Sequence, residues 1–219
     1  FEGVPGIDML GRQVNQRLGP KMCHSVVNQY GKPRMLSEFY GCTGGALTFE
    51  DRHWMAGMQL ALGVTLINPH LSLYTMAGCR KRDYPQNMYY QQPWWPLNHL
   101  CDDPLSRTCV ALSQGQYVAD ALIIHPQESV LALWQVHAPI ENGERVYPYE
   151  EEPTAPGVRD QVNELDASAK AAMEALLGAQ RTMDFGDETI LADDGAVEIG
   201  IAGPRLRVGK MLYPAVIIP

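Results

Sequence analysis

The sequence predicts an α/β fold in two parts: residues 1–115 as a portion of a (β/α)8 barrel of the TIM type, and residues 116–219 as the start of a doubly wound sheet. In the first part, short apolar runs alternate with stretches of helical periodicity, as expected of parallel strands joined by helices. A polar side chain stands where each of the first three runs ends, which is where α/β barrels keep their chemistry. In the second part, a buried strand, a long helix and further strands begin a new sheet.

Three strand–helix units account for the first part. Pro20 suits the first position of a helix and Gly31 ends that helix, while Thr48 is placed to cap the next one and Gly63 closes it. The last helix contains Pro104, which we expect to break or kink its beginning. The expected strands lie within residues 4–10, 33–41 and 64–70, and the expected helices within residues 20–30, 48–63 and 98–112.

The second part opens with a buried strand at Val118–Pro126. Its clearest helix begins at Asp160 and ends at Gly178, with one apolar stripe along its length. Two more strands and a small hairpin between them are expected at Thr182–Phe185, Tyr213–Pro219 and residues 196–208. Three strand–helix units cannot close a barrel of eight, and the last strand has no helix to cover it, so we expect the 219 residues to be a fragment.

Composition excludes several classes of partner. The formal net charge is −8, so no clustered excess of Lys and Arg is available for nucleic acid or an anionic membrane surface. Five cysteines without a CxxC pair indicate neither a disulfide framework nor a zinc site, and reduced thiols favour the cytoplasm. The sequence shows no signal peptide and no membrane span, and the alternative that a signal peptide has been removed stays open. The acidic stretch at residues 150–156 is expected to be an exposed loop rather than a metal site.

The candidate site is centred on Glu38, which a short apolar run delivers into a glycine-rich loop. The alternative is that Glu38 is only a polar residue that starts a loop. Asp8, Asn68 and His70 stand at the ends of the two other strands of the first part. Because parallel strands bring their carboxyl ends to one side, these four side chains should line a common pocket, with Glu38 within about 15 Å of His70.

A long segment, residues 71–96, follows the third strand and is rich in Tyr and Trp. Aromatic faces interleaved with Arg, Asp and Gln suit a carbohydrate, whose C–H faces stack on rings while its hydroxyls bind polar side chains. For any single ring, plugging a barrel mouth or a domain contact is an equally good interpretation. The members that we expect to contact a ligand are Tyr74, Arg80, Arg82, Trp94 and Trp95.

Six stretches, in order along nearly the whole chain, form a combination that is more specific than any one motif. They are Pro5-Gly-Ile-Asp8, Gly31-Lys-Pro-Arg-Met-Leu-Ser-Glu-Phe-Tyr-Gly41, Leu47-Thr-Phe-Glu-Asp51, Gly63-Val-Thr-Leu-Ile-Asn-Pro-His70, Tyr89-Tyr-Gln-Gln-Pro-Trp-Trp95 and Asp184-Phe-Gly-Asp-Glu188. Together they resemble bacterial glycoside hydrolases of the α-L-rhamnosidase-like type. The resemblance implies the C-terminal portion of the barrel at residues 1–115 and the N-terminal portion of a flavodoxin- or amidotransferase-like domain at residues 116–219.

The resemblance also implies roles for the site residues. Glu38 falls on the seventh barrel strand and would be a catalytic carboxylate, acting as nucleophile or base, while the second carboxylate would lie upstream of Phe1. Asp8 and Asp83 are weaker local substitutes for that second group. The implied substrate is a carbohydrate, with an α-L-rhamnoside as the leading guess. The remaining site residues, Asp8, Asn68, His70, Tyr74, Arg80, Arg82, Trp94 and Trp95, would bind it.

No cofactor is expected except calcium, which the resemblance allows at the site without indicating its ligands. We expect a second copy of the chain, or a missing chain, to complete the barrel. Two other function classes stay open: a noncatalytic carbohydrate-binding or structural module, and a nucleotide binder built on the second part. The nucleotide binder has the least support, because no GxGxxG or Walker loop follows Val118–Pro126.

Overall fold

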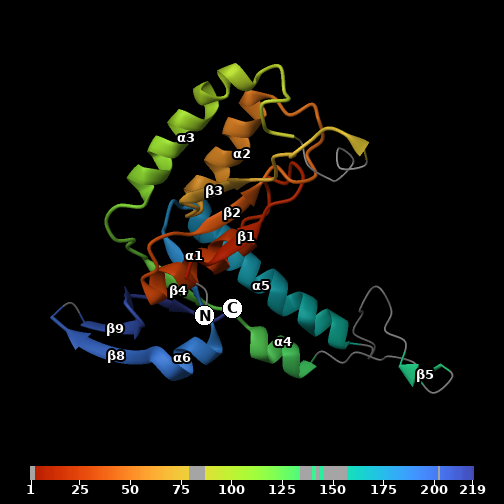
Figure 1. The fold of residues 1–219 in the computed structure, drawn as a ribbon. Helices are drawn as coiled ribbons and strands as arrows, with labels where there is room; N and C mark the ends of the chain where they lie inside the picture. Colours follow the sequence, from red (N-terminus) through yellow and green to blue (C-terminus); the bar gives the residue numbers. More distant parts are fainter. Residues whose placement is uncertain (1–2, 79–86, 134–139, 142–143, 146–156, 202) are drawn as a thin grey trace. The chain divides into compact units, whose positions relative to one another are not determined.

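The structure, a computed structural model, describes residues 3–78, 87–133, 140–141, 144–145, 157–201 and 203–219 (Figure 1). The chain divides into two compact units, Phe1–Tyr117 and Val118–Pro219. This division lies two residues beyond the boundary expected after residue 115. Each unit contains its own parallel sheet and its own helices.

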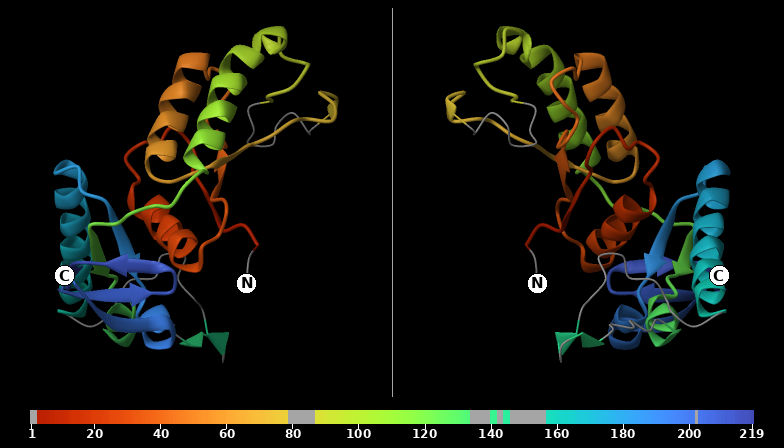
Figure 2. Two further views of the ribbon diagram at one scale, coloured as in Figure 1. Left: turned by 90° about the vertical axis from the view of Figure 1, so that its left-hand side faces the viewer. Right: turned by 90° about the vertical axis from the view of Figure 1, so that its right-hand side faces the viewer.

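The first unit is built on three parallel strands in sequence order: β1 (Gly6–Asp8), β2 (Leu36–Phe39) and β3 (Leu66–Pro69). The helices that connect them are α1 (Leu18–Tyr30) and α2 (Phe49–Ala61). A 3-10 turn, η2 (Trp95–Leu97), leads into α3 (His99–Leu112), which lies beside α2 in both views (Figures 1 and 2). The order of strands and helices in this unit agrees with the sequence prediction, and the described residues form an open sheet rather than a closed barrel.

One face of this sheet carries the core of the first unit. Phe39 is fully buried in a cluster with apolar side chains of all three helices, and Ile7 and Ile67 pack against the same cluster. Ser37 is also buried on this face, where its Oγ donates to Gln59 Oε1 of α2 at 2.5 Å. Because side chains alternate along a strand, Glu38 must lie on the opposite face. That face is not covered by the three helices.

Helix α2 begins and ends where the sequence signals predict. The Thr48 hydroxyl accepts from the backbone N–H of Asp51, and the Asp51 carboxylate accepts from the backbone N–H of Thr48, so a full capping box opens the helix. Inside the unit, the buried Arg52 guanidinium donates to Asn98 Oδ1 at 2.8 Å and Asp102 Oδ1 at 2.6 Å. It also lies over three aromatic rings, those of Tyr40, Phe49 and Trp94.

Of the two effects expected of Pro104, a break or a kink at the beginning of α3, the break does not occur. The helix runs from His99 to Leu112 with Pro104 inside it. A proline removes one backbone hydrogen bond, but α3 also buries Cys101, Leu105 and Cys109 in the core of the unit. This burial holds the helix on both sides of the proline.

The second unit contains a three-stranded parallel sheet in the order β11-β4-β7. Its strands and helices are β4 (Ala121–Ile124), α4 (Gln127–Leu133), α5 (Val158–Gly178), β7 (Met183–Gly186), α6 (Glu188–Asp194) and β11 (Val216–Ile217). A second sheet in the order β10-β9-β8 is antiparallel and comprises β8 (Gly195–Gly200), β9 (Gly203–Val208) and β10 (Met211–Tyr213). Two short strands, β5 (Ile140–Glu141) and β6 (Glu144–Arg145), pair with each other.

Two details of the second unit differ from the sequence prediction. The strand expected at Tyr213–Pro219 is split: Tyr213 ends β10, which pairs with β9, whereas Val216–Ile217 forms β11 beside β4. Pro214 stands at the break, and its lack of a backbone N–H prevents one continuous ladder. Helix α6 was not expected; the Asp187 side chain caps it by accepting from the N–H of Ile190 at 3.1 Å. The acidic stretch at residues 150–156 lies outside the described residues.

Candidate functional site

The carboxyl ends of the three strands place polar side chains in one row. Asp8 is the register partner of Glu38, and Glu38 is the register partner of Asn68. Register partners on parallel strands point to the same face and have their backbones about 4.8 Å apart. Asp8, Glu38 and Asn68 therefore lie side by side on the face that the helices leave open. The convergence expected from the sequence is present for these three residues.

His70, the residue that follows β3, completes the group. Its Nε2 lies 3.7 Å from Glu38 Oε1, and the two side chains keep 18% and 27% of their exposure. The backbone N–H of His70 donates to the carbonyl of Phe39 at 2.7 Å, which fixes the position of the ring relative to β2. The imidazole Nδ1 is buried and has no hydrogen-bond partner among the described residues. The distance between Glu38 and His70 is well inside the limit expected for one ligand pocket.

The loop after Glu38, residues 40–48, forms one wall of this group. A Cβ placed on Gly41 would lie 3.5 Å from Glu38 Oε1, 3.5 Å from His70 Cγ and 3.0 Å from Leu10 Cδ2. The contacts with Glu38 and His70 would be ordinary van der Waals contacts and the contact with Leu10 would be tight, so Gly41 lies close against both site residues. On either side of Gly41, Tyr40 and Cys42 have φ values of 69° and 60°, which residues with a side chain rarely adopt. Strained backbone of this kind often marks a functional site.

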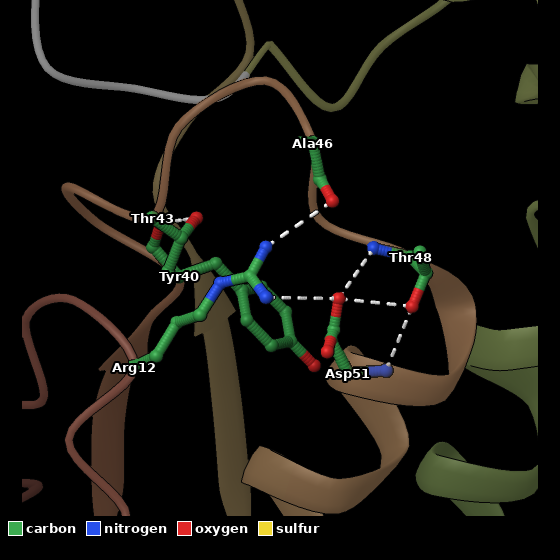
Figure 3. A network of polar contacts seen from close by, with 6 residues as sticks. All are labelled: Arg12, Tyr40, Thr43, Ala46, Thr48 and Asp51. Atoms are coloured by element: carbon green, nitrogen blue, oxygen red, sulfur yellow. Dashed lines mark hydrogen bonds and ion pairs between the residues drawn. The ribbon is translucent and has the colours of Figure 1, made fainter.

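The loop after β1 is joined to the loop after β2. Met9 N–H donates to the Glu38 carbonyl at 3.1 Å, and Gly11 N–H donates to the Gly41 carbonyl at 2.7 Å. The Arg12 guanidinium then crosses to the second loop (Figure 3). Sequence reasoning missed Arg12; the available signal was a basic residue directly after Gly11 in the loop that follows the Asp8 strand.

The Asp51 carboxylate that pairs with Arg12 is already held in place by Thr48. Hydrogen bonds from the backbone and the side chain of Thr48, followed by the charge of Arg12, hold the pKa of Asp51 below its ordinary value. The carboxylate thus stays ionised at the start of α2, where the positive end of the helix also favours a negative charge.

The described rings of the aromatic segment pack on one another and on Phe49 or are exposed. Tyr74 is 95% exposed. Trp94 packs edge-to-face on Phe49 with 5.6 Å between ring centroids, and Trp95 packs in the same manner on Tyr89 at 5.3 Å. Trp94 therefore contributes to the packing around Arg52 and α2. Arg80, Arg82 and Asp83 lie outside the described residues.

Two other features bear on where a ligand could bind. A cavity of about 340 Å³ lies between β3 and α3, lined by residues that include Arg34, Ile67 and Cys109 but neither Asp8 nor Glu38. Within the part of the chain that the structure describes, no group of three or more His, Cys, Asp and Glu side chains is arranged to hold a metal ion. Among the described cysteines, Cys42, Cys101 and Cys109 are free thiols. No helix among the described residues is both long and apolar enough to cross a bilayer.

Comparison with known proteins adds one structural likeness. No protein-family model matches the sequence, and no curated protein matches it. The chain is similar to a solved structure of a rhamnosidase from Novosphingobium sp. PP1Y, with a TM-score of 0.60 and 16% sequence identity. The match covers 99% of this chain and 18% of that enzyme. At this identity the similarity shows the fold alone: the chain has the fold of a limited part of a much longer rhamnosidase.

Proposed function

We propose that this chain is part of a glycoside hydrolase and that Glu38 is one of its two catalytic carboxylates. The observation that carries the proposal is the position of Glu38 at the carboxyl end of a parallel strand. It lies on the open face of the sheet, with Asp8 and Asn68 on either side and the His70 imidazole 3.7 Å away. A carboxylate in such a group can reach a sugar, while its neighbours bind hydroxyls. The fold similarity to a rhamnosidase supports this choice among the functions of α/β sheets.

The assigned role of Glu38 is nucleophile or general base. Glycoside hydrolysis uses a pair of carboxyl groups, one that protonates the leaving oxygen and one that attacks the sugar or activates water. The imidazole Nε2 lies 3.7 Å from Glu38 Oε1, within ion-pair distance, and an approach of a few tenths of an ångström would let it donate a hydrogen bond to this carboxylate. The other carboxyl group belongs to a part of the enzyme beyond this chain, with Asp8 as the next candidate. An α-L-rhamnoside is the leading substrate, and Asp8, Asn68 and His70 would bind its hydroxyls.

The test compares Glu38→Gln with the unchanged enzyme in the full-length protein, with a panel of aryl glycosides that includes an α-L-rhamnoside. Glutamine keeps the shape of the side chain and removes its charge, so kcat should fall by a factor of about 100 or more while substrate affinity changes little. Glu50→Gln is the matched control, because it removes the same charge from an exposed position in the first turn of α2. Near-normal turnover of Glu38→Gln would make Glu38 a structural strand-end residue.

The competing function is a noncatalytic carbohydrate-binding module. It is favoured by the almost fully exposed ring of Tyr74, which could stack on a sugar without any chemistry. The same panel separates the two functions. Sugar binding without turnover in both the full-length parent and Glu38→Gln favours the module, whereas turnover that depends on Glu38 favours the hydrolase.

A further inference from the structure

We infer that Arg12 is a positioning residue, which holds the loop after β2 against the loop after β1 and so sets where the Gly41 wall lies relative to Glu38. This inference rests on the proposed function. The first step is the path of the chain after Asp8. Gly11 turns it with a φ of 64°, and Arg12 is then directed across the edge of the sheet. Its side chain is about half exposed, so specific polar contacts, and not burial, hold it against the second loop.

The contacts of Arg12 span the second loop from its far end to the helix that follows (Figure 3). Nη2 donates to the Ala46 carbonyl at 3.1 Å, and Nη1 lies 3.3 Å from Asp51 Oδ2. The planar guanidinium thus binds two acceptors at once, which a lysine ammonium can do only with less directional control. Asp51 is itself fixed by Thr48, whose backbone N–H and hydroxyl both donate to Oδ2, at 3.0 and 2.9 Å.

The near end of the same loop, at Gly41, forms the wall of the site. Gly41 accepts from the Gly11 N–H and stands beside Glu38 Oε1 and the His70 ring. The backbone between Gly41 and Ala46 includes Cys42 with a φ of 60°, a conformation that a residue with a side chain keeps only when its surroundings hold it. Arg12 holds the far end of the loop, and the bond from Gly11 to Gly41 holds the near end. Both attachments come from the loop after β1.

The consequence for catalysis is a matter of geometry. Displacement of a positioning group by about 1 Å can reduce the rate by up to two orders of magnitude, even when nothing touches the substrate directly. An exposed ion pair, in contrast, contributes little to the stability of a protein. Arg12 should therefore matter more for the activity of the full-length enzyme than for its melting temperature.

The experiment measures kcat, KM and melting temperature for Arg12→Ala, Arg12→Lys and Asp51→Asn in the full-length enzyme with the aryl glycoside that it cleaves best. We expect kcat/KM to fall about tenfold in Arg12→Ala, with lysine restoring part of the loss. Arg12→Ala combined with Asp51→Asn should be little worse than either alone, because both remove the same contact. Arg207→Ala is the matched control: it removes an equally exposed arginine from its pair with Glu198 in the second unit and should leave kcat/KM within about twofold.

A second readout does not depend on activity. Hydrogen exchange of the Gly11 amide, which donates to Gly41, should be about tenfold faster in Arg12→Ala if the two loops separate more often. Unchanged exchange at Gly11, or kcat/KM of Arg12→Ala within twofold of the unchanged enzyme, overturns the inference. A loss of activity that lysine does not relieve and that follows a lower melting temperature also overturns it. If Glu38→Gln stays active while Gly11 exchanges faster, the proposed function fails and the joining of the loops by Arg12 stands.

Discussion

Gly63 ends α2 with a backbone conformation and a close approach that only glycine permits. Its φ is 110°, and a Cβ at this position would overlap the His24 ring, with Nε2 at 2.7 Å. Gly63→Ala should therefore destabilise the protein by at least about 2 kcal/mol, through overpacking and backbone strain together. Gly115→Ala is the control, since its φ is 79° but the space around it is open, and it should cost about 1 kcal/mol. Urea unfolding of both variants checks the difference; equal losses would show that the His24 contact is unimportant.

His24 carries a pH dependence of stability. Burial, and then the positive charge of Lys21, lower the pKa of His24 to about 3. The folded state therefore keeps the ring neutral, while the unfolded chain takes up a proton below about pH 6.5. The stability that this neutral ring contributes is fully present above pH 6.5 and is lost as the pH falls toward 3.

The prediction is a loss of about 2 kcal/mol in the free energy of unfolding between pH 8 and pH 5, a range in which carboxyl groups stay largely ionised. His24→Gln should flatten this part of the profile, because glutamine does not titrate. His53→Asn, at an exposed position of α2, should leave it unchanged. Denaturant melts at several pH values measure all three profiles, and a His24→Gln profile as steep as that of the unchanged protein would contradict the assignment.

At the scale of the element, the start of α2 depends on one side chain. Thr48 accepts from the N–H of Asp51 and so satisfies one of the backbone donors that a helix leaves open. Thr48→Ala should cost about 1 kcal/mol of stability, whereas Thr48→Ser, which keeps the hydroxyl, should cost much less. Thermal melts of the two variants measure this difference. An alanine variant as stable as the serine variant would mean that water replaces the cap without loss.

The elements that the sequence predicted well are those with local causes. Gly31 and Thr48 act within one turn of the chain, and the helix ends that they set appear where expected, whereas α1 begins at Leu18, so that Pro20 is its third residue and not its first. Pro214 was a local signal for the split at residues 213–217, but the partners of the two halves, β9 and β4, could not be predicted because they lie far away in the sequence.

The candidate site divides in the same way. The row formed by Asp8, Glu38 and Asn68 follows from strand order and parallel direction, both of which the pattern of the chain indicates. The reach of Arg12 to Ala46 and the packing of Trp94 on Phe49 do not, because they depend on the paths of loops and on side-chain conformations that no periodicity encodes. The roles of the site residues, as opposed to their places, stay predictions.

At the scale of the whole molecule, the parallel sheet of each unit has a central strand that is bonded on both sides: β2 in the first unit and β4 in the second. Hydrogen exchange should therefore find the slowest amides of each unit in these strands, with Leu122 and Ile123 fully buried in β4. The amides of β8, at the edge of its sheet and with exposed Val197 and Ile199, should exchange much faster. Mass spectrometry of peptides from each strand tests this order, and protection of β8 equal to that of β4 would contradict it.

Side chains alternate between the two faces of β2, so a change in the number of residues in this strand would move them to the other face. Ser37 points to Gln59 under α2, and Glu38 points to the open face. Deleting Leu36 would shift the residues that follow it by one position, so that the Glu38 carboxylate would face the apolar core and the Phe39 ring would take its place on the open face. Most single replacements nearby would do less harm than such a shift.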